Sequence, residues 1–236
     1  MDRLYLYINI FTIAAPLLLS FDKKVAFYKD WKYLFPAILI MAVVFIGKDA
    51  IFASLGIWGF NDEYLIGVRM LGLPIEEWMF FITVPYACVF IYACLVAYLK
   101  VDPLKNIHRP FLFILSITLL LVGIIYFNRL YTSIIFIATA LLILYNLYRR
   151  QPWLSMFLLS YFVSIIPFFL VNGILTGSFI ESPVVWYDPS QNLGIRLFTI
   201  PIEDTIYNLM MLMMTVQLME AFKGINSKFK IQSPKL

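Results

Sequence analysis

Long runs without a charged residue are the feature that most constrains the fold of this chain. Residues 4–21, 78–99, 110–128, 130–148 and 151–180 are each uncharged and mostly apolar. A helix needs about 20 such residues to cross a bilayer. Two further runs are interrupted or flanked by charge: 33–47 resumes as 50–61 after Lys48 and Asp49, and 205–219 follows Glu203 and Asp204. We interpret the seven segments as transmembrane helices, two of which carry ionisable groups at their ends.

The composition excludes several classes of protein. Of the 236 residues, 62% are apolar and 14% are charged, whereas a soluble domain is roughly half apolar and a quarter charged. A soluble globular enzyme, a disordered tail and a nucleic-acid-binding module are therefore excluded, and the lipid bilayer is the expected surroundings. The seven segments leave no room for a separate soluble domain, so we predict an all-α integral membrane protein.

The distribution of basic residues predicts how the chain is oriented in the membrane. An odd number of spans puts the termini on opposite sides. One side holds most of the Lys and Arg residues, while the other has only Arg3, Lys48, Arg69, Arg129 and Arg196. The positive-inside rule then places the C-terminus in the cytoplasm and the N-terminus outside, in a multi-pass protein of the cytoplasmic membrane.

The chain repeats itself at an offset of 127 residues. Segment 67–77, GVRMLGLPIEE, aligns with 194–204, GIRLFTIPIED, with five identical residues in eleven positions. Phe60-Asn61 aligns with Tyr187-Asp188 at the same offset, and Asp49 aligns with Asn172 after an insertion of four residues.

This repeat predicts the arrangement of the spans. Each copy of the motif opens a span, the third and the seventh, and two helices that are four spans apart run in the same direction. We therefore predict two parallel three-helix repeats, residues 1–105 and 130–236, joined by a connecting helix within 106–129. Parallel repeats are related by an axis along the membrane normal, so both motifs should lie at one depth and face one pocket.

Both motifs have the pattern Pro-x-Glu-acid, with Glu76-Glu77 in the first copy and Glu203-Asp204 in the second. One interpretation is structural, because proline is favoured as the first residue of a helix and acids in the first turn complement the helix dipole. However, two adjacent acids exceed what a helix start requires, and the preceding residues offer no capping oxygen. A carboxyl group in an apolar pocket favours its protonated form, so the functional interpretation is a proton donor.

Other residues near the motifs are candidates for supporting roles. Arg69 and Arg196, five residues before each proline, either hold a second acid ionised or anchor the chain at the interface. Asp49 and Asn172 are further supporting candidates. Aromatic faces attract cations without being nucleophilic, although interfacial aromatic belts also explain such rings. The candidate substrate-binding residues are Trp58, Trp78, Phe80, Phe81, Trp186, Tyr207 and Asn208.

Several cofactor signals are missing from the sequence. No Gly-x-Gly-x-x-Gly motif suggests FAD or NAD, and His108 is the only histidine, so no histidine-based metal site is expected. We expect neither a metal nor a cofactor. We expect no lysine inside a span that could carry a retinal Schiff base, which disfavours a seven-span photoreceptor. A small proton-coupled carrier remains an alternative, although carrier sites tend to lie at the membrane midplane.

On these motifs the chain resembles the membrane-integral lycopene cyclases, whose two copies of a three-span domain each carry a Pro-x-Glu-(Glu/Asp) motif. The matching segments here are 73–81, LPIEEWMFF, and 200–208, IPIEDTIYN. The flanking segments 58–61, 85–88 and 171–177 also resemble sequences of this family. The resemblance extends over nearly the whole chain, and the two motifs together make it specific.

The resemblance implies a non-redox carotenoid cyclase, an isomerase of the intramolecular lyase type. An acid protonates the terminal double bond of a lycopene ψ end, the next double bond attacks the cation, and loss of a proton leaves a β-ionone ring, as in β-carotene. Our hypothesis makes Glu76 or Glu203 the donor, while Glu77 and Asp204 orient it or help to remove the final proton. The substrate would be lycopene or a related acyclic carotenoid, and other carotenoid enzymes are candidate partners.

The residues leave several alternatives open. An ε or γ ring, cyclisation of one or both substrate ends, and one or two working motifs are all compatible with the sequence. So is another terpenoid substrate, such as a prenylated quinone, a meroterpenoid or a longer carotenoid, since the acid chemistry would be the same.

Overall fold

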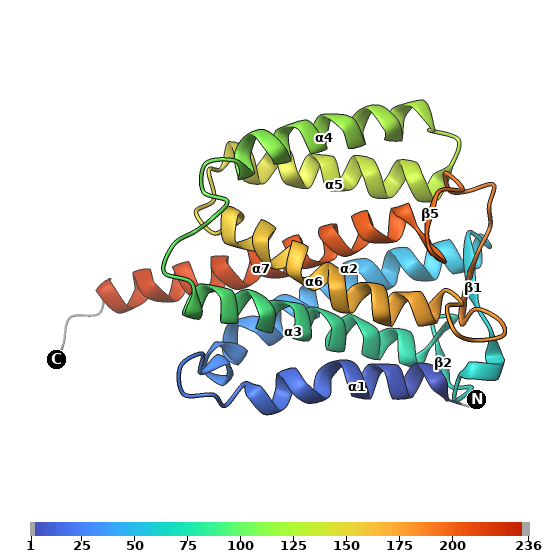
Figure 1. Ribbon diagram of the computed structural model, residues 1–236, viewed down its shortest axis with the longest axis horizontal. Coiled ribbons are helices and arrows are strands. Elements are labelled where there is room, and N and C mark those ends of the chain that lie inside the picture. The colour runs from blue at the N-terminus through green and yellow to red at the C-terminus, as the bar shows by residue number, and fades with distance from the viewer. Residues whose placement is uncertain (1–2, 233–236) are drawn as a thin grey trace.

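The structure, a computed structural model, describes residues 3–232, with side chains up to residue 225. The outermost residues of the predicted repeats, 1–2 and 233–236, lie outside this range. Within the described residues, seven α-helices pass back and forth along one bundle (Figure 1). They are α1 (Leu4–Leu19), α2 (Trp31–Ser54), α3 (Ile75–Tyr98), α4 (His108–Ile125), α5 (Leu130–Tyr148), α6 (Leu154–Leu175) and α7 (Ile202–Gln232).

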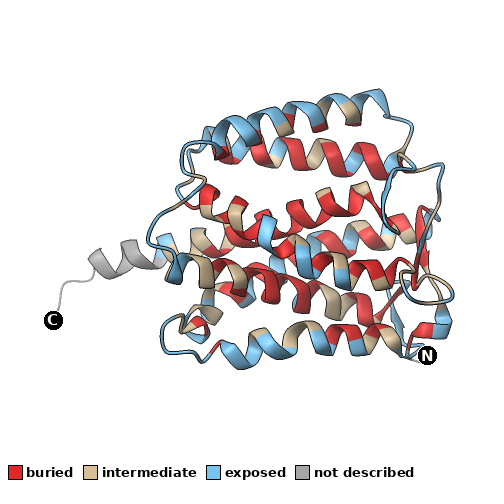
Figure 2. Ribbon diagram, viewed as in Figure 1, coloured by how far each residue is buried: buried red, intermediate tan, exposed pale blue. Residues whose placement is uncertain are grey.

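The predicted all-α class is confirmed, and every segment predicted to span the membrane contains one helix. The second predicted segment is too long at its end, because α2 stops at Ser54 and residues 58–60 form a strand. Within the described residues, five helices are long and apolar enough to cross a membrane: α2 with the 3-10 turn η1 (Phe27–Asp30) before it, α3, α4, α5 and α6. Helix α1 is an apolar helix of 16 residues. Buried residues concentrate in the middle of the bundle, while α4 packs along α5 and most of its residues are exposed (Figure 2).

The prediction that no lysine lies inside a spanning helix is wrong. Lys48 and Asp49 do not end a span, because α2 continues through both to Ser54. Lys48 is therefore a lysine inside a long apolar helix, six residues before its end. Its ammonium group forms an ion pair with the buried carboxylate of Asp49 at 2.6 Å, and this pairing compensates both charges within the bundle.

Short strands join the helices at one end of the bundle (Figure 1). Strand β1 (Trp58–Phe60) pairs with β4 (Val185–Tyr187), and a 3-10 turn, η2 (Asp62–Tyr64), follows β1. Two hairpins precede α3 and α7: β2 (Arg69–Met70) with β3 (Leu73–Pro74), and β5 (Arg196–Leu197) with β6 (Ile200–Pro201). Pro74 ends its hairpin in an extended conformation and is the N-cap of α3, so the helix begins at Ile75, one residue later than if proline were its first residue.

Candidate active site

The hairpins fix where each acidic motif begins. The Arg69 guanidinium donates to the Gly72 carbonyl at 3.1 Å and pairs with Asp62, and that of Arg196 donates to the Thr199 carbonyl at 2.5 Å. In the described part of the chain, neither guanidinium is bonded to a motif acid. The two arginines therefore brace the turns, and the hypothesis that they hold a second acid ionised gains no contact in its favour.

The first acid of each motif is tied to backbone. Glu76 accepts a hydrogen bond from the N–H of Ile66 at 2.6 Å, and Glu203 accepts one from the N–H of Leu193 at 2.7 Å. Glu203 also accepts from the hydroxyl of Thr132 at 2.6 Å. Both side chains are fully buried, and their other oxygens have no hydrogen-bond partner among the described residues. These two glutamates fasten the loop before each hairpin to the start of the following helix.

The second acid of each motif faces a shared cavity. Glu77 accepts a hydrogen bond from the Tyr5 hydroxyl at 2.5 Å. Asp204 accepts three, from Tyr131 at 2.5 Å, Tyr187 at 2.7 Å and the Asn172 amide at 2.8 Å. A cavity of about 40 Å³ is lined by both Glu77 and Asp204. One acid from each motif therefore meets the other at a single site, where they differ in the number of hydrogen-bond donors around them.

Aromatic rings make up most of the wall around these two acids. The rings belong to Tyr5, Trp58, Phe60, Phe80, Tyr131, Phe168, Tyr187 and Tyr207. The remaining lining includes Asn172 and Asn208. Such a wall combines weakly nucleophilic π faces with a small number of polar groups, which suits a positively charged hydrocarbon intermediate.

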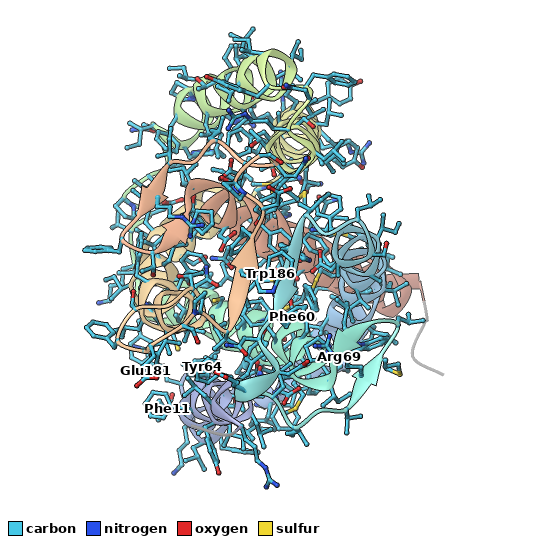
Figure 3. The ribbon with its side chains drawn as sticks, turned by 90° about the vertical axis from the view of Figure 1, so that its right-hand side faces the viewer. Phe11, Phe60, Tyr64, Arg69, Glu181 and Trp186 are labelled. Atoms are coloured by element: carbon cyan, nitrogen blue, oxygen red, sulfur yellow. The ribbon has the colours of Figure 1, made fainter. Side chains whose placement is uncertain are left out.

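The β1–β4 ribbon covers the cavity at the end of the bundle. Trp58 and Tyr187 are opposite one another and both line the cavity, while Trp186 alternates to the outer face and is 44% exposed. Figure 3 shows Trp186 and Phe60 near the centre of this end. The ribbon thus separates the acids from the surface above them.

The structure brings together only some of the predicted substrate-binding residues. Trp58, Phe80, Tyr207 and Asn208 line the cavity, whereas Trp78, Phe81 and Trp186 do not. The Trp78 indole donates to the Met70 carbonyl at 3.2 Å, which places it beside the first hairpin. Phe81 is fully buried and packs against the rings of Phe45 and Phe80.

Asp49 reaches the cavity through a tyrosine. Its Oδ2 accepts a hydrogen bond from the Tyr207 hydroxyl at 2.7 Å, and its Oδ1 pairs with the ammonium of Lys48. The ammonium also lies 3.9 Å from the centre of the Tyr207 ring, where a cation is attracted electrostatically. Asp49, which the sequence offers as a supporting candidate, therefore contacts a residue that lines the cavity, and so does Lys48, which sequence reasoning did not include.

Comparison with known families shows which family the chain belongs to. A family model described as lycopene cyclase matches residues 2–95 and 128–222, and each matched stretch contains one acidic motif. The chain belongs to the lycopene cyclase family. It is therefore an enzyme, a cyclase with a carotenoid substrate, and the resemblance seen in the sequence is confirmed. No curated protein and no solved structure matches the chain.

Sequence reasoning missed the tyrosines that surround the acids of this lycopene cyclase family member. Tyr5 and Tyr131 are each the second residue of a helix, α1 and α5, and each follows a leucine. The recurrence of Leu-Tyr at the start of equivalent spans was a signal that could have found them. Tyr187 was aligned with Phe60 in the repeat, but its role as a donor depends on the ribbon that turns it inward.

Proposed function

We propose that this member of the lycopene cyclase family converts the ψ ends of lycopene into β rings, with Glu77 as proton donor and Asp204 as the ionised partner. One observation carries the proposal: two acids from different motifs share one aromatic cavity but have unequal hydrogen-bond environments. The β ring is the product that the family resemblance suggests.

The unequal environments support a division of labour between the two acids. Hydrogen bonds to an ionised carboxylate favour the charged form, and Asp204 accepts three of them. Glu77 accepts one, from Tyr5, and otherwise faces rings. A site that keeps one carboxyl group neutral beside a charged one supplies both an acid and an anion at the same pH.

The reaction then proceeds without oxidation or reduction. The O–H bond of Glu77 breaks as its proton adds to the terminal double bond, and the cation formed is attacked by the next double bond to close the ring. A ring C–H bond breaks, its electron pair forms the new double bond, and the carboxylate of Asp204 takes the proton. Return of that proton to Glu77 restores the starting state, so substrate and product have the same mass.

The cavity walls would protect the cation during these steps. The rings of Trp58, Phe60 and Tyr207 attract positive charge without forming a bond to it. The β1–β4 ribbon lies between the acids and the surface, where it limits access of water. Water in contact with the cation would convert it to an alcohol.

We further propose that the chain crosses the membrane seven times, with the C-terminus in the cytoplasm and the N-terminus outside, as two parallel repeats, 1–105 and 130–236, around a connecting helix within 106–129. Matching contacts at the 127-residue offset support the repeats. Glu76 and Glu203 bind the equivalent residues Ile66 and Leu193. The N–H groups of Ile75 and Ile202 likewise bond the carbonyls of Val68 and Ile195.

Product analysis in cells that accumulate lycopene tests the proposed activity. We expect a product of unchanged mass with the absorption spectrum of β-ring carotenoids, measured by chromatography and mass spectrometry. Glu77→Gln should abolish the product while the protein remains folded in the membrane. Glu63→Gln, in the exposed turn η2, is the matched control and should retain activity. Unchanged lycopene in the presence of folded wild-type protein would overturn the proposal and favour another terpenoid substrate.

A further inference from the structure

An apolar groove opens on the side of the bundle between α1, α3 and α6. It has a volume of about 330 Å³, and Ala15, Val84, Ala87 and Cys88 contribute to its wall. At its rim, Phe11 is 83% exposed and Leu170 is 64% exposed. Figure 3 shows Phe11 at the outer side of α1. The groove therefore lies on a surface of the apolar helices that would face lipid.

The groove adjoins the cavity that holds the acids. Phe80 and Phe168 each line both spaces, so their rings lie between the groove and the site. Phe80 lies on α3, one turn after Glu77. An apolar chain lying in the groove would therefore point its end toward the acid that we propose as proton donor.

The equivalent side of the other half is filled with larger side chains at the matching positions. At the 127-residue offset, the groove residues Val84 and Ala87 are replaced by the larger Met211 and Met214, and Phe80 is replaced by Tyr207. Met211 is fully buried. In the alignment that pairs Asp49 with Asn172, Val171 of the groove is replaced by Lys48.

Lys48 adds a polar barrier on this filled side. Its ammonium lies against the Tyr207 ring and is bound to Asp49, which in turn binds the Tyr207 hydroxyl. A hydrocarbon chain entering here would have to displace paired charges, at a large desolvation cost. The two halves therefore differ in what they offer an apolar ligand: one has a groove, and the other has methionines and an ion pair.

We propose that the acyclic carotenoid reaches the acids from the bilayer through the groove between α1, α3 and α6, and that only one of its ends is bound at a time. This inference rests on the proposed cyclase function. A conjugated chain is stiff and cannot turn around inside the groove. Cyclisation of the second end therefore requires the molecule to withdraw, reverse and bind again.

Filling the groove tests the route. Ala87→Phe deep in the groove and Ala15→Phe near its mouth should each slow product formation by about tenfold or more, because the added ring occupies the path. Val43→Phe is the matched control, since Val43 lines a separate apolar groove between α2 and α3. Thermal unfolding of each variant in detergent shows whether it is folded. If wild-type protein forms product and both folded groove variants match the control, the route is overturned while the cyclase function stands.

Photocrosslinking tests the route without requiring turnover. A benzophenone side chain is placed at position 11 or, as control, at position 43, in protein carrying Glu77→Gln so that lycopene is not consumed. After irradiation in lycopene-containing vesicles, mass spectrometry should find a lycopene adduct at position 11 in at least about tenfold excess over position 43. Equal adduct formation at both positions would contradict a specific route.

A time course tests whether the ends are bound one at a time. The free monocyclic carotenoid should appear before the bicyclic one, and its share should rise with the ratio of lycopene to enzyme, because released intermediate then competes with fresh substrate. Bicyclic product that forms at every ratio without any monocyclic precursor would overturn this part of the proposal.

Discussion

Gly59 lies directly opposite Trp186 in the β1–β4 pair, and the Trp186 indole covers the place that a side chain at residue 59 would occupy. The two residues are separated by 127 positions, the offset of the internal repeat. Their neighbours Trp58 and Tyr187 are also opposite one another in the two strands. The ribbon thus pairs two segments that are equivalent in the internal repeat. The two strands can lie close together at their centre because Gly59 has no side chain.

Gly59→Ala should destabilise the ribbon. The added methyl group would overlap the indole of Trp186, and overpacking of this kind lowers the free energy of unfolding by about 1–3 kcal/mol. Thermal unfolding in detergent measures the loss. Gly47→Ala, in α2 with open space around it, is the control and should cause no loss. The double variant Gly59→Ala/Trp186→Ala should regain stability, and failure to do so would show that the indole is not the obstacle.

Glu76 and Glu77 should respond differently to the same substitution. In Glu76→Gln the amide oxygen can still accept the hydrogen bond from Ile66, so we expect folded and active protein, unlike Glu77→Gln. Glu76→Ala leaves that N–H without its partner and should lower the free energy of unfolding by about 1–3 kcal/mol. Product yield and thermal unfolding together separate the two roles. Folded but inactive Glu76→Gln would return the donor role to Glu76, as the sequence-based hypothesis had it.

Tyr131→Phe should reduce turnover without unfolding the protein. The variant removes one of the three hydrogen bonds to Asp204. A hydrogen bond to a charged group contributes about 1.5–3 kcal/mol, so the rate should fall by about 10- to 100-fold. Initial rates of product formation in vesicles measure the change. Tyr145→Phe, an exposed position on the same helix, should be unaffected, and an equal rate in both variants would argue against an ionised Asp204.

Lys48→Met should destabilise the bundle because it leaves the buried carboxylate of Asp49 without its counter-charge. Removal of one partner of a buried ion pair costs about 3–5 kcal/mol. Lys48→Met/Asp49→Asn removes both charges and should recover most of that stability. Unfolding in denaturant measures all variants, with Lys105→Met in an exposed loop as control. Equal stability of Lys48→Met and wild type would mean that the ion pair does not contribute to the stability of the bundle.

The helices and the family were predictable from sequence because both depend on local pattern. Charge-free runs of about 20 residues predict apolar helices whatever their neighbours are, and the two acidic motifs are contiguous in the chain. The contacts between the acids and their hydrogen-bond partners were not predictable from local pattern. Tyr5 and Glu77 are 72 residues apart, and Tyr131 and Asp204 are 73 apart, so these contacts exist only after the helices have packed.

Which acid faces the cavity was also beyond local reasoning. Adjacent residues on a helix point about 100° apart, so Glu76 and Glu77 cannot share a direction. The sequence does not say which direction is the interior, so the hypothesis that the first glutamate of each motif is the donor had no contact to test it. The loop before each hairpin decides the matter, because its N–H groups bind the first acid and leave the second to the cavity.

The shared cavity has a consequence for how the two acids can differ. Because α3 supplies Glu77 and α7 supplies Asp204, the proposed site needs helices from both ends of the chain. A symmetric pair of identical short chains would present two identical acids to each other, with nothing to distinguish donor from acceptor. A single chain has no such restriction, and here the two acids differ in residue type and in the hydrogen bonds that they accept.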